Sequence, residues 1–152
     1  MIPFAEPDLT GNERRYLLEA LDSGWISKGD FITRFELKLM ERFGWHAVVC
    51  SSGTAALHLA LLAGGIGHGA RVILPDLTFA SAAHVVKHVG AELVLADVDS
   101  YGLISAAAVH ELAYRGARAV MPTHLFGIEC DMRGIMATAR QYGLLVIEDA
   151  AE

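Results

Sequence analysis

Residues suited to binding an anion occur together in the segment Ser51–Thr54, SSGT. A short β-branched run, Ala47–Cys50, comes before them and an apolar helical pattern, Thr54–Ala63, follows, which predicts a strand-to-helix turn. The first amides of a helix have no intrahelical partner and lie at the positive end of the helix dipole. The serine and threonine hydroxyls add donors, and the glycine allows a ligand to approach the backbone closely. The turn therefore suits a phosphate group, although an ordinary serine-capped turn explains the same residues.

Further polar residues follow three other predicted strands. In open α/β sheets, ligands bind beyond the carboxyl ends of the strands, so these residues are expected at one edge of the sheet. They are Asp76–Phe79, the pair Thr123 and His124, and the pair Glu148 and Asp149.

Asp149 is the most informative of these residues, because it follows the apolar run Leu144–Ile147 and is expected at the end of a buried strand. A buried carboxylate needs a partner, since an unpaired charge is expensive to desolvate. A protonated ring nitrogen of a ligand is one candidate, and an arginine or a helix N-terminus is another. Phe79 could stack on a flat ring or simply pack in the core. A phosphate cradle, an aromatic ring and a buried aspartate together suit pyridoxal phosphate (PLP).

The elements that would position these residues alternate along the chain. The pattern predicts an α/β fold, with a mainly parallel sheet and helices on both faces. Residues 1–44 are expected to form an N-terminal arm and two helices, and residues 45–152 the N-terminal part of a ligand-binding domain. The arm is Met1–Asp8, a capping box is expected at Thr10–Glu13, and the second helix ends at Gly44. The predicted strands are Ala47–Cys50, Val72–Leu74, Glu92–Ala96, Ala119–Pro122 and Leu144–Ile147, and the helices between them are Thr54–Ala63, Phe79–Val89, Ser105–Tyr114 and Met132–Tyr142.

Composition narrows the class of protein. The 152 residues carry a net charge of −6 without a basic stripe, which argues against nucleic acid as a partner. The longest apolar run, Ala55–Ile66, is too short to span a bilayer, and the N-terminus lacks the features of a signal peptide. Two isolated cysteines, Cys50 and Cys130, indicate reduced thiols. A cytoplasmic protein is expected.

Three other patterns resemble known ligand-binding motifs but lack the surroundings or the residues that those motifs require. The glycine motif Gly65–Ala70 lies between a helix and a strand, whereas a dinucleotide fingerprint must follow a strand and open a helix. His84 and His88 have the spacing of metal ligands without an accompanying glutamate, so no metal site is predicted. The segment that begins at Asp97 resembles a calcium loop but has Ala108 where a glutamate is needed.

The sequence as a whole resembles the DegT/DnrJ/EryC1/StrS family of sugar aminotransferases. The likeness lies in IPFAEPDLTGNE, SGWISKGDFITRFE, the segment from VVCSSGTAALHLALLAGG through LPDLTFASAAHVV, DVDSYGLI, and MPTHLFGIECDMRG through VIEDAAE. The GWIS loop and the EDAAE motif resemble the perosamine-synthetase-like branch. This resemblance implies the large domain of a PLP-dependent fold-type I aminotransferase, incomplete at its C-terminus. Such an enzyme, a homodimer, moves an amino group from glutamate to a nucleotide-diphosphate keto sugar.

Matching the family motifs residue by residue implies a role for each position. Asp149 would pair with the pyridine nitrogen as the catalytic carboxylate, and Phe79 would stack on the ring. Glu152 would lie near the phenolic oxygen of the cofactor, where two adjacent anions would repel each other. The cofactor-binding set is Ser52, Gly53, Thr54, Ala55, Phe79, Asp149 and Glu152, and the substrate-side set is Trp25, Ser27, Lys28 and His124.

Family members hold the cofactor covalently through a Schiff-base lysine beyond the EDAA motif. The lysines here are Lys28, Lys38 and Lys87, and none matches that position. We therefore expect a fragment that is inactive by itself. A non-catalytic half-domain that binds a cofactor or a partner is the alternative, and a nicotinamide-dependent oxidoreductase would require the misplaced glycine motif.

Overall fold

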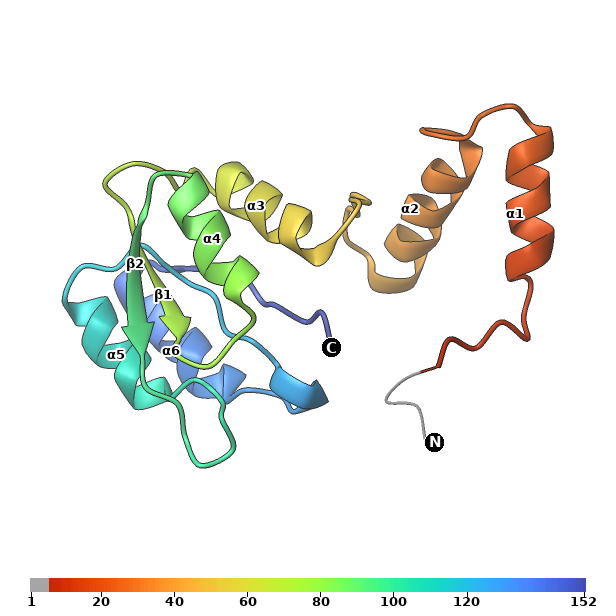
Figure 1. The fold of residues 1–152 in the computed structure, drawn as a ribbon. Helices are drawn as coiled ribbons and strands as arrows, with labels where there is room; N and C mark the ends of the chain where they lie inside the picture. Colours follow the sequence, from red (N-terminus) through yellow and green to blue (C-terminus); the bar gives the residue numbers. More distant parts are fainter. Residues whose placement is uncertain (1–5) are drawn as a thin grey trace. The chain divides into compact units, whose positions relative to one another are not determined.

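The computed structural model describes residues 6–152, which fall into two compact units divided between Val49 and Cys50 (Figure 1). The predicted arm, Met1–Asp8, lies largely outside the described residues. The division indicates that the N-terminal helices and the α/β part each form their own set of contacts.

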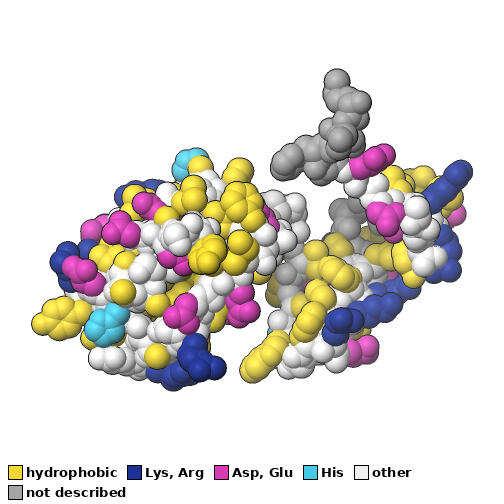
Figure 2. Space-filling model, turned by 90° about the horizontal axis from the view of Figure 1, so that it is seen from below, with side chains coloured by type: hydrophobic (Ala, Val, Ile, Leu, Met, Phe, Trp, Pro, Cys, Tyr) yellow, Lys and Arg dark blue, Asp and Glu magenta, His cyan; other side chains and the backbone are white. Residues whose placement is uncertain are grey.

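The N-terminal unit is built around two helices, α1 (Glu13–Asp22) and α2 (Asp30–Phe43). Gly44, in the left-handed conformation with φ 74°, ends α2 as predicted, because glycine adopts this conformation without steric cost. The rings of Tyr16 and Phe31 meet edge to face, with centroids 5.8 Å apart. No residue of either helix is buried, and apolar side chains reach the surface of both units (Figure 2).

The predicted capping box at the start of α1 is wrong. The helix begins after Asn12, whose side chain makes no capping hydrogen bond. Thr10 instead donates its hydroxyl and its amide to the Asp8 carboxylate, at 2.7 and 3.0 Å. These two bonds lower the pKa of the Asp8 carboxyl. A carboxylate two residues upstream thus takes the hydroxyl that the capping box required.

The C-terminal unit contains a four-stranded parallel sheet in the order β2-β1-β3-β4. The strands are β1 (Arg71–Pro75), β2 (Glu92–Ala96), β3 (Ala119–Val120) and β4 (Leu145–Val146). Ile73 pairs with Val94 on one side and Val120 on the other, so β1 lies inside the sheet. The carboxyl ends of all four strands therefore meet at one edge.

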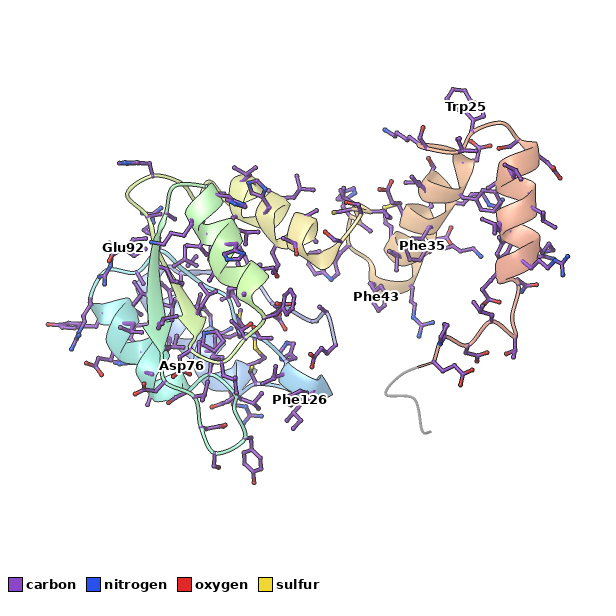
Figure 3. All side chains as sticks on the ribbon, in the orientation of Figure 1. Trp25, Phe35, Phe43, Asp76, Glu92 and Phe126 are labelled. Carbon is purple, nitrogen blue, oxygen red and sulfur yellow. The ribbon has the colours of Figure 1, made fainter. Side chains whose placement is uncertain are left out.

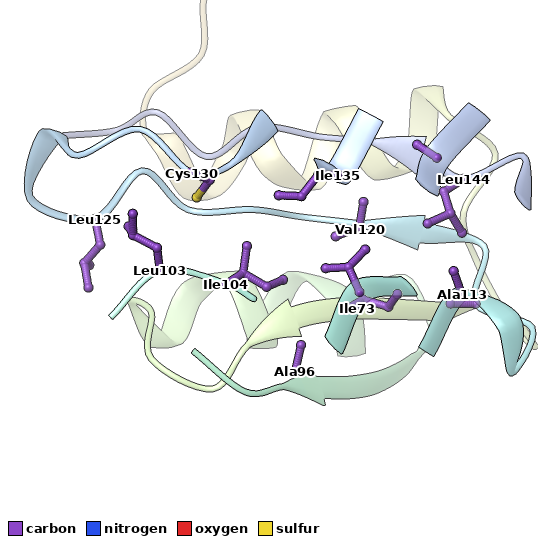
Figure 4. Packing of buried hydrophobic residues seen from close by; sticks show 13 residues of the cluster. Ile73, Ala96, Leu103, Ile104, Ala113, Val120, Leu125, Cys130, Ile135 and Leu144 are labelled. Atoms are coloured by element: carbon purple, nitrogen blue, oxygen red, sulfur yellow. The ribbon is translucent and has the colours of Figure 1, made fainter. Parts of the chain in front are cut away.

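Helices cover both faces of the sheet (Figure 1). One buried cluster joins the sheet to α3 (Gly53–Ala63) and α4 (Ala80–His88), through side chains such as Leu61 and Val86. The other joins it to α5 (Ala106–Tyr114) and α6 (Met132–Tyr142), through Ile73, Val109 and Ile135 (Figure 4). The predicted parallel α/β fold with helices on both faces is confirmed.

Local capping fixes where these helices start. The side chains of Ser52, Ser105 and Asp131 accept amides of the first turns of α3, α5 and α6. A short 3-10 turn, η1 (Leu125–Gly127), follows β3. Within residues 6–152, no helix is long and apolar enough to cross a membrane.

The strand predicted at Ala47–Cys50 is wrong, since this segment has no regular secondary structure. Val48 is 76% exposed, and the Val49 amide donates to the Glu36 carboxylate at 2.9 Å. An apolar β-branched run becomes a strand only where a neighbouring strand takes up its backbone groups. Here a side chain takes up that amide.

Candidate active site

The N-terminus of α3 presents backbone amides directed out of the helix. The first intrahelical bond runs from the Ala56 amide to the Ser52 carbonyl at 3.0 Å, which leaves the Gly53 and Thr54 amides without an intrahelical acceptor. The Ser52 hydroxyl caps the helix by accepting the Ala55 amide at 3.2 Å. The cap interpretation and the anion-site interpretation are thus compatible, because they use different amides.

Asp149 is positioned by an extension of the pairing between β3 and β4. Its amide donates to the Pro122 carbonyl at 2.9 Å, and its carbonyl accepts the His124 amide at 3.0 Å. A parallel bridge pairs Asp149 with Thr123. The backbone beyond the two strands therefore stays paired and carries the carboxylate to the sheet edge.

One pocket of about 240 Å³ brings together most of the predicted cofactor-binding residues. Gly53 and Thr54 line it from α3, Phe79 from the start of α4, and Asp149 and Glu152 from the chain after β4. A Cβ atom built at Gly53 would meet only the Cβ atom of Ala151, at 3.8 Å. The backbone at Gly53 is therefore open to close approach by a ligand, as a phosphate cradle requires.

The charges around this pocket suit a ligand with a phosphate at one end and a cation at the other. Asp149 is 8% exposed, and its Oδ1 accepts the Ala151 amide at 3.3 Å. Among residues 6–152, no lysine, arginine or histidine forms an ion pair with it. The structural arginine considered from the sequence is thus not found in the described part of the chain. A protonated ring nitrogen would supply the missing positive charge.

Phe79 and a pair of threonines complete the mouth of the site. The Phe79 side chain is 75% exposed, so its ring is available to a flat ligand rather than packed in the core. Behind it, the hydroxyls of Thr78 and Thr123 lie 2.9 Å apart. This contact ties the loop after β1 to the end of β3.

His124 has both ring nitrogens engaged. Its Nδ1 accepts the Cys130 amide at 3.2 Å, so Nε2 carries the proton and donates to Glu148 at 3.0 Å. The Cys130 thiol donates to the Thr123 carbonyl at 3.1 Å, and burial raises the pKa of this thiol. Hydrogen bonds from Cys130 to Thr123 and His124 therefore hold the two ends of this segment together beside the site.

Three substrate-side candidates, Trp25, Ser27 and Lys28, lie in the N-terminal unit (Figure 3). Trp25 and Ser27 line a pocket of about 220 Å³ between the ends of α1 and α2. Lys28 is exposed in the same loop. These residues thus share one loop of the N-terminal unit, whereas the residues lining the pocket with Asp149 belong to the C-terminal unit.

The pair of histidines rejected above as a metal site, His84 and His88, does not line the pocket that contains Asp149. His88 lies against His58, with ring centroids 6.1 Å apart. In the part of the chain that the structure describes, no three histidine, cysteine or acidic side chains are placed to hold a metal ion.

Residues that the sequence did not point to also form the site. Leu57 and Ser81 line the pocket with the predicted residues. Ser81 could have been found from its position in the first turn of α4, two residues after the predicted ring contact Phe79. Nothing in the sequence indicated that the Glu152 carboxylate would accept a hydrogen bond from the Phe126 amide.

Solved structures that resemble this chain include aminotransferases. The aminotransferase from Psychrobacter cryohalolentis superposes with a TM-score of 0.87 at 33% identity, over 96% of this chain and 38% of that one. The PLP form of the putative sugar aminotransferase Spr1654 from Streptococcus pneumoniae gives 0.84 at 29% identity, over 99% and 38%. This chain therefore shares its fold with a part of each of these aminotransferases.

The chain belongs to the DegT/DnrJ/EryC1/StrS aminotransferase family, whose model matches residues 7–152. It is 48% identical to a GDP-perosamine synthase from Caulobacter vibrioides, over 99% of this chain. The resemblance to this family and to its perosamine-synthetase-like branch is thus confirmed. The chain spans 42% of that relative's length.

Proposed function

We propose that this chain is the N-terminal part of a PLP-dependent aminotransferase that transfers an amino group from glutamate to a nucleotide-linked keto sugar. The observation that carries the proposal is the pocket that joins the free amides of α3 to the buried carboxylate of Asp149. Similarity to a GDP-perosamine synthase supports a GDP-linked keto sugar as substrate. The complete protein would act as a cytoplasmic homodimer, and its covalent lysine would lie beyond residue 152.

The residues of the pocket divide the binding of PLP among them. The Gly53 and Thr54 amides and the Thr54 hydroxyl would hold the phosphate, with Ser52 and Ala55 fixing the first turn. Phe79 would cover one face of the ring. Glu152 would form the wall on the side of the ring oxygen. When bound, PLP supplies an electron sink for the carbanion formed at the amine carbon.

Asp149 would hold a proton on the ring nitrogen, which keeps the ring electron-poor. Its burial favours this role, because a carboxylate in a low-dielectric site interacts strongly with an adjacent cation. On the substrate side, the candidates implied by the family resemblance are Trp25, Ser27 and Lys28 in the N-terminal unit and His124 in the C-terminal unit, each expected near the substrate or the dimer contact.

The experiment measures amino-sugar formation by the complete protein with PLP, glutamate and GDP-, UDP- or dTDP-linked keto sugars. Asp149→Asn should lower kcat by about 100-fold or more, because the amide cannot hold the proton as a carboxylate does. Asp97→Asn, at the exposed end of β2 and outside the pocket, is the control and should retain activity.

Two results would contradict the proposal. One is an active Asp149→Asn variant. The other is a complete protein that binds PLP without converting any keto sugar, which would favour the non-catalytic half-domain.

A further inference from the structure

Glu152 contributes to two cavities at once. It lines the pocket that contains Asp149, and it also lines a cavity of about 420 Å³ on the other side, together with His124, Gly127 and Glu148. The second cavity is bounded by the loop of residues 124–130, which we call the clamp loop. Glu152 is therefore placed to link the cofactor pocket to that loop.

The clamp loop has an unusual backbone at its tip. Phe126 has φ 55° and ψ 28°, and it is the only non-glycine residue with a positive φ among residues 6–152. A side chain rarely adopts this conformation, so the surrounding structure must hold it there. The Glu152 carboxylate accepts the Phe126 amide and is thus the group that fixes the tip.

The base of the clamp loop is fixed independently. His124 accepts the Cys130 amide at 3.2 Å and donates to Glu148 at 3.0 Å. Two carboxylates that follow β4, Glu148 and Glu152, therefore hold the base and the tip of the same loop. With the base and the tip both fixed, the exposed side chain at the tip is presented in one orientation.

That side chain is the Phe126 ring, which is 77% exposed at the tip of the loop (Figure 3). A fixed aromatic face suits the apolar C–H face of a sugar ring. We propose that Glu152 is a positioning residue that holds the Phe126 amide, and that the clamp loop thereby presents Phe126 to the sugar substrate. This inference rests on the proposed function.

Two readouts in the complete protein test the proposal. The first is hydrogen exchange of the Phe126 amide without any ligand, and the second is kinetics with the keto sugar alongside titration with PLP. Glu152→Ala should speed exchange about tenfold or more and raise KM for the sugar about tenfold, because the amide loses a charged acceptor. The dissociation constant for PLP should rise less than KM for the sugar, although Glu152 also lines the cofactor pocket, and kcat should change less than KM.

Matched variants separate positioning from other effects. Glu152→Gln keeps an acceptor oxygen of the same reach, so it should restore slow exchange and most of the sugar affinity. Glu111→Ala removes an exposed carboxylate from α5, which lines neither cavity, and should change neither readout. Phe126→Ala should raise KM for the sugar without speeding hydrogen exchange of the Cys130 amide at the base of the clamp loop.

Unchanged exchange at Phe126 in the Glu152→Ala protein would overturn the proposal. So would a loss of PLP affinity equal to or larger than the loss of sugar affinity, since Glu152 would then affect the sugar only through the cofactor. Failure of the unsubstituted protein to bind PLP would instead refute the proposed function, because the exchange measurement uses no ligand.

Discussion

Gly53 offers a substitution that separates the folding role of the first turn of α3 from its proposed binding role. Gly53 is the first residue of the helix, and a Cβ atom there would meet only the Ala151 Cβ atom, at ordinary van der Waals distance. Alanine favours the helix over glycine by up to about 1 kcal/mol, so Gly53→Ala should leave stability unchanged or slightly raised. In a domain of about 150–250 residues, 1 kcal/mol corresponds to about 2–4 °C in Tm.

Ligand binding should respond in the opposite direction. The added methyl group would occupy the place where a phosphate approaches the backbone, and extra volume at a packed site costs about 1–3 kcal/mol. This cost corresponds to a dissociation constant for PLP that is about 5- to 150-fold higher. A protein of equal or slightly higher stability that binds its cofactor less well is therefore expected.

The assay combines thermal unfolding of the unliganded complete protein with titration of PLP by absorbance. Gly67→Ala is the matched control, because its Cβ atom would also find only an ordinary contact, 3.5 Å from the Val89 carbonyl oxygen, outside the pocket. Its affinity for PLP should equal that of the unsubstituted protein. If Gly53→Ala binds PLP equally well, the backbone at Gly53 is not the phosphate cradle.

Two further predictions concern stability. Ser52→Ala removes the acceptor of the Ala55 amide and should lower the free energy of unfolding in urea by about 1 kcal/mol, whereas Ser52→Asp should preserve it; equal losses in both variants would exclude a capping role. The pKa of the Cys130 thiol is raised by burial, so its protonated form is favoured in the folded state. Its contribution to stability is complete below the unfolded pKa of about 8.5 and is lost as the pH rises through the folded pKa. Urea unfolding between pH 7 and 10 should show this decline, and a decline of the same size in Cys130→Ala would contradict the assignment.

Helices were predicted well from local spacing. The segments Thr54–Ala63 and Ser105–Tyr114 each differ from the observed helices by one residue at one end, and Phe79–Val89 differs by one residue at each end. Ser52, Ser105 and Asp131 cap through side chains within three residues of the amides they accept. Such contacts depend on sequence spacing alone, which is why the sequence indicates them. The failed capping box at Thr10 shows the limit, since Asp8 competes for the same hydroxyl.

Strands were predicted less well because their partners are distant in sequence. The run Ala47–Cys50 has the composition of a strand, yet the Val49 amide bonds to Glu36. β3 and β4 are shorter than predicted, although their pairing extends through isolated contacts as far as Asp149. Composition shows that a segment can pair, and only the fold decides whether a partner is present.

The sequence by itself determined the α/β class, the serine-capped start of a helix at Ser52–Ala55 and the family, since each depends on residues close together in the chain or on motif order. The tertiary structure decided the strand order and the grouping of Gly53, Phe79 and Asp149 around one pocket. It also decided that Glu152 meets the Phe126 amide. Parallel strands are joined by crossover helices, so residues far apart in sequence become neighbours only when the sheet forms.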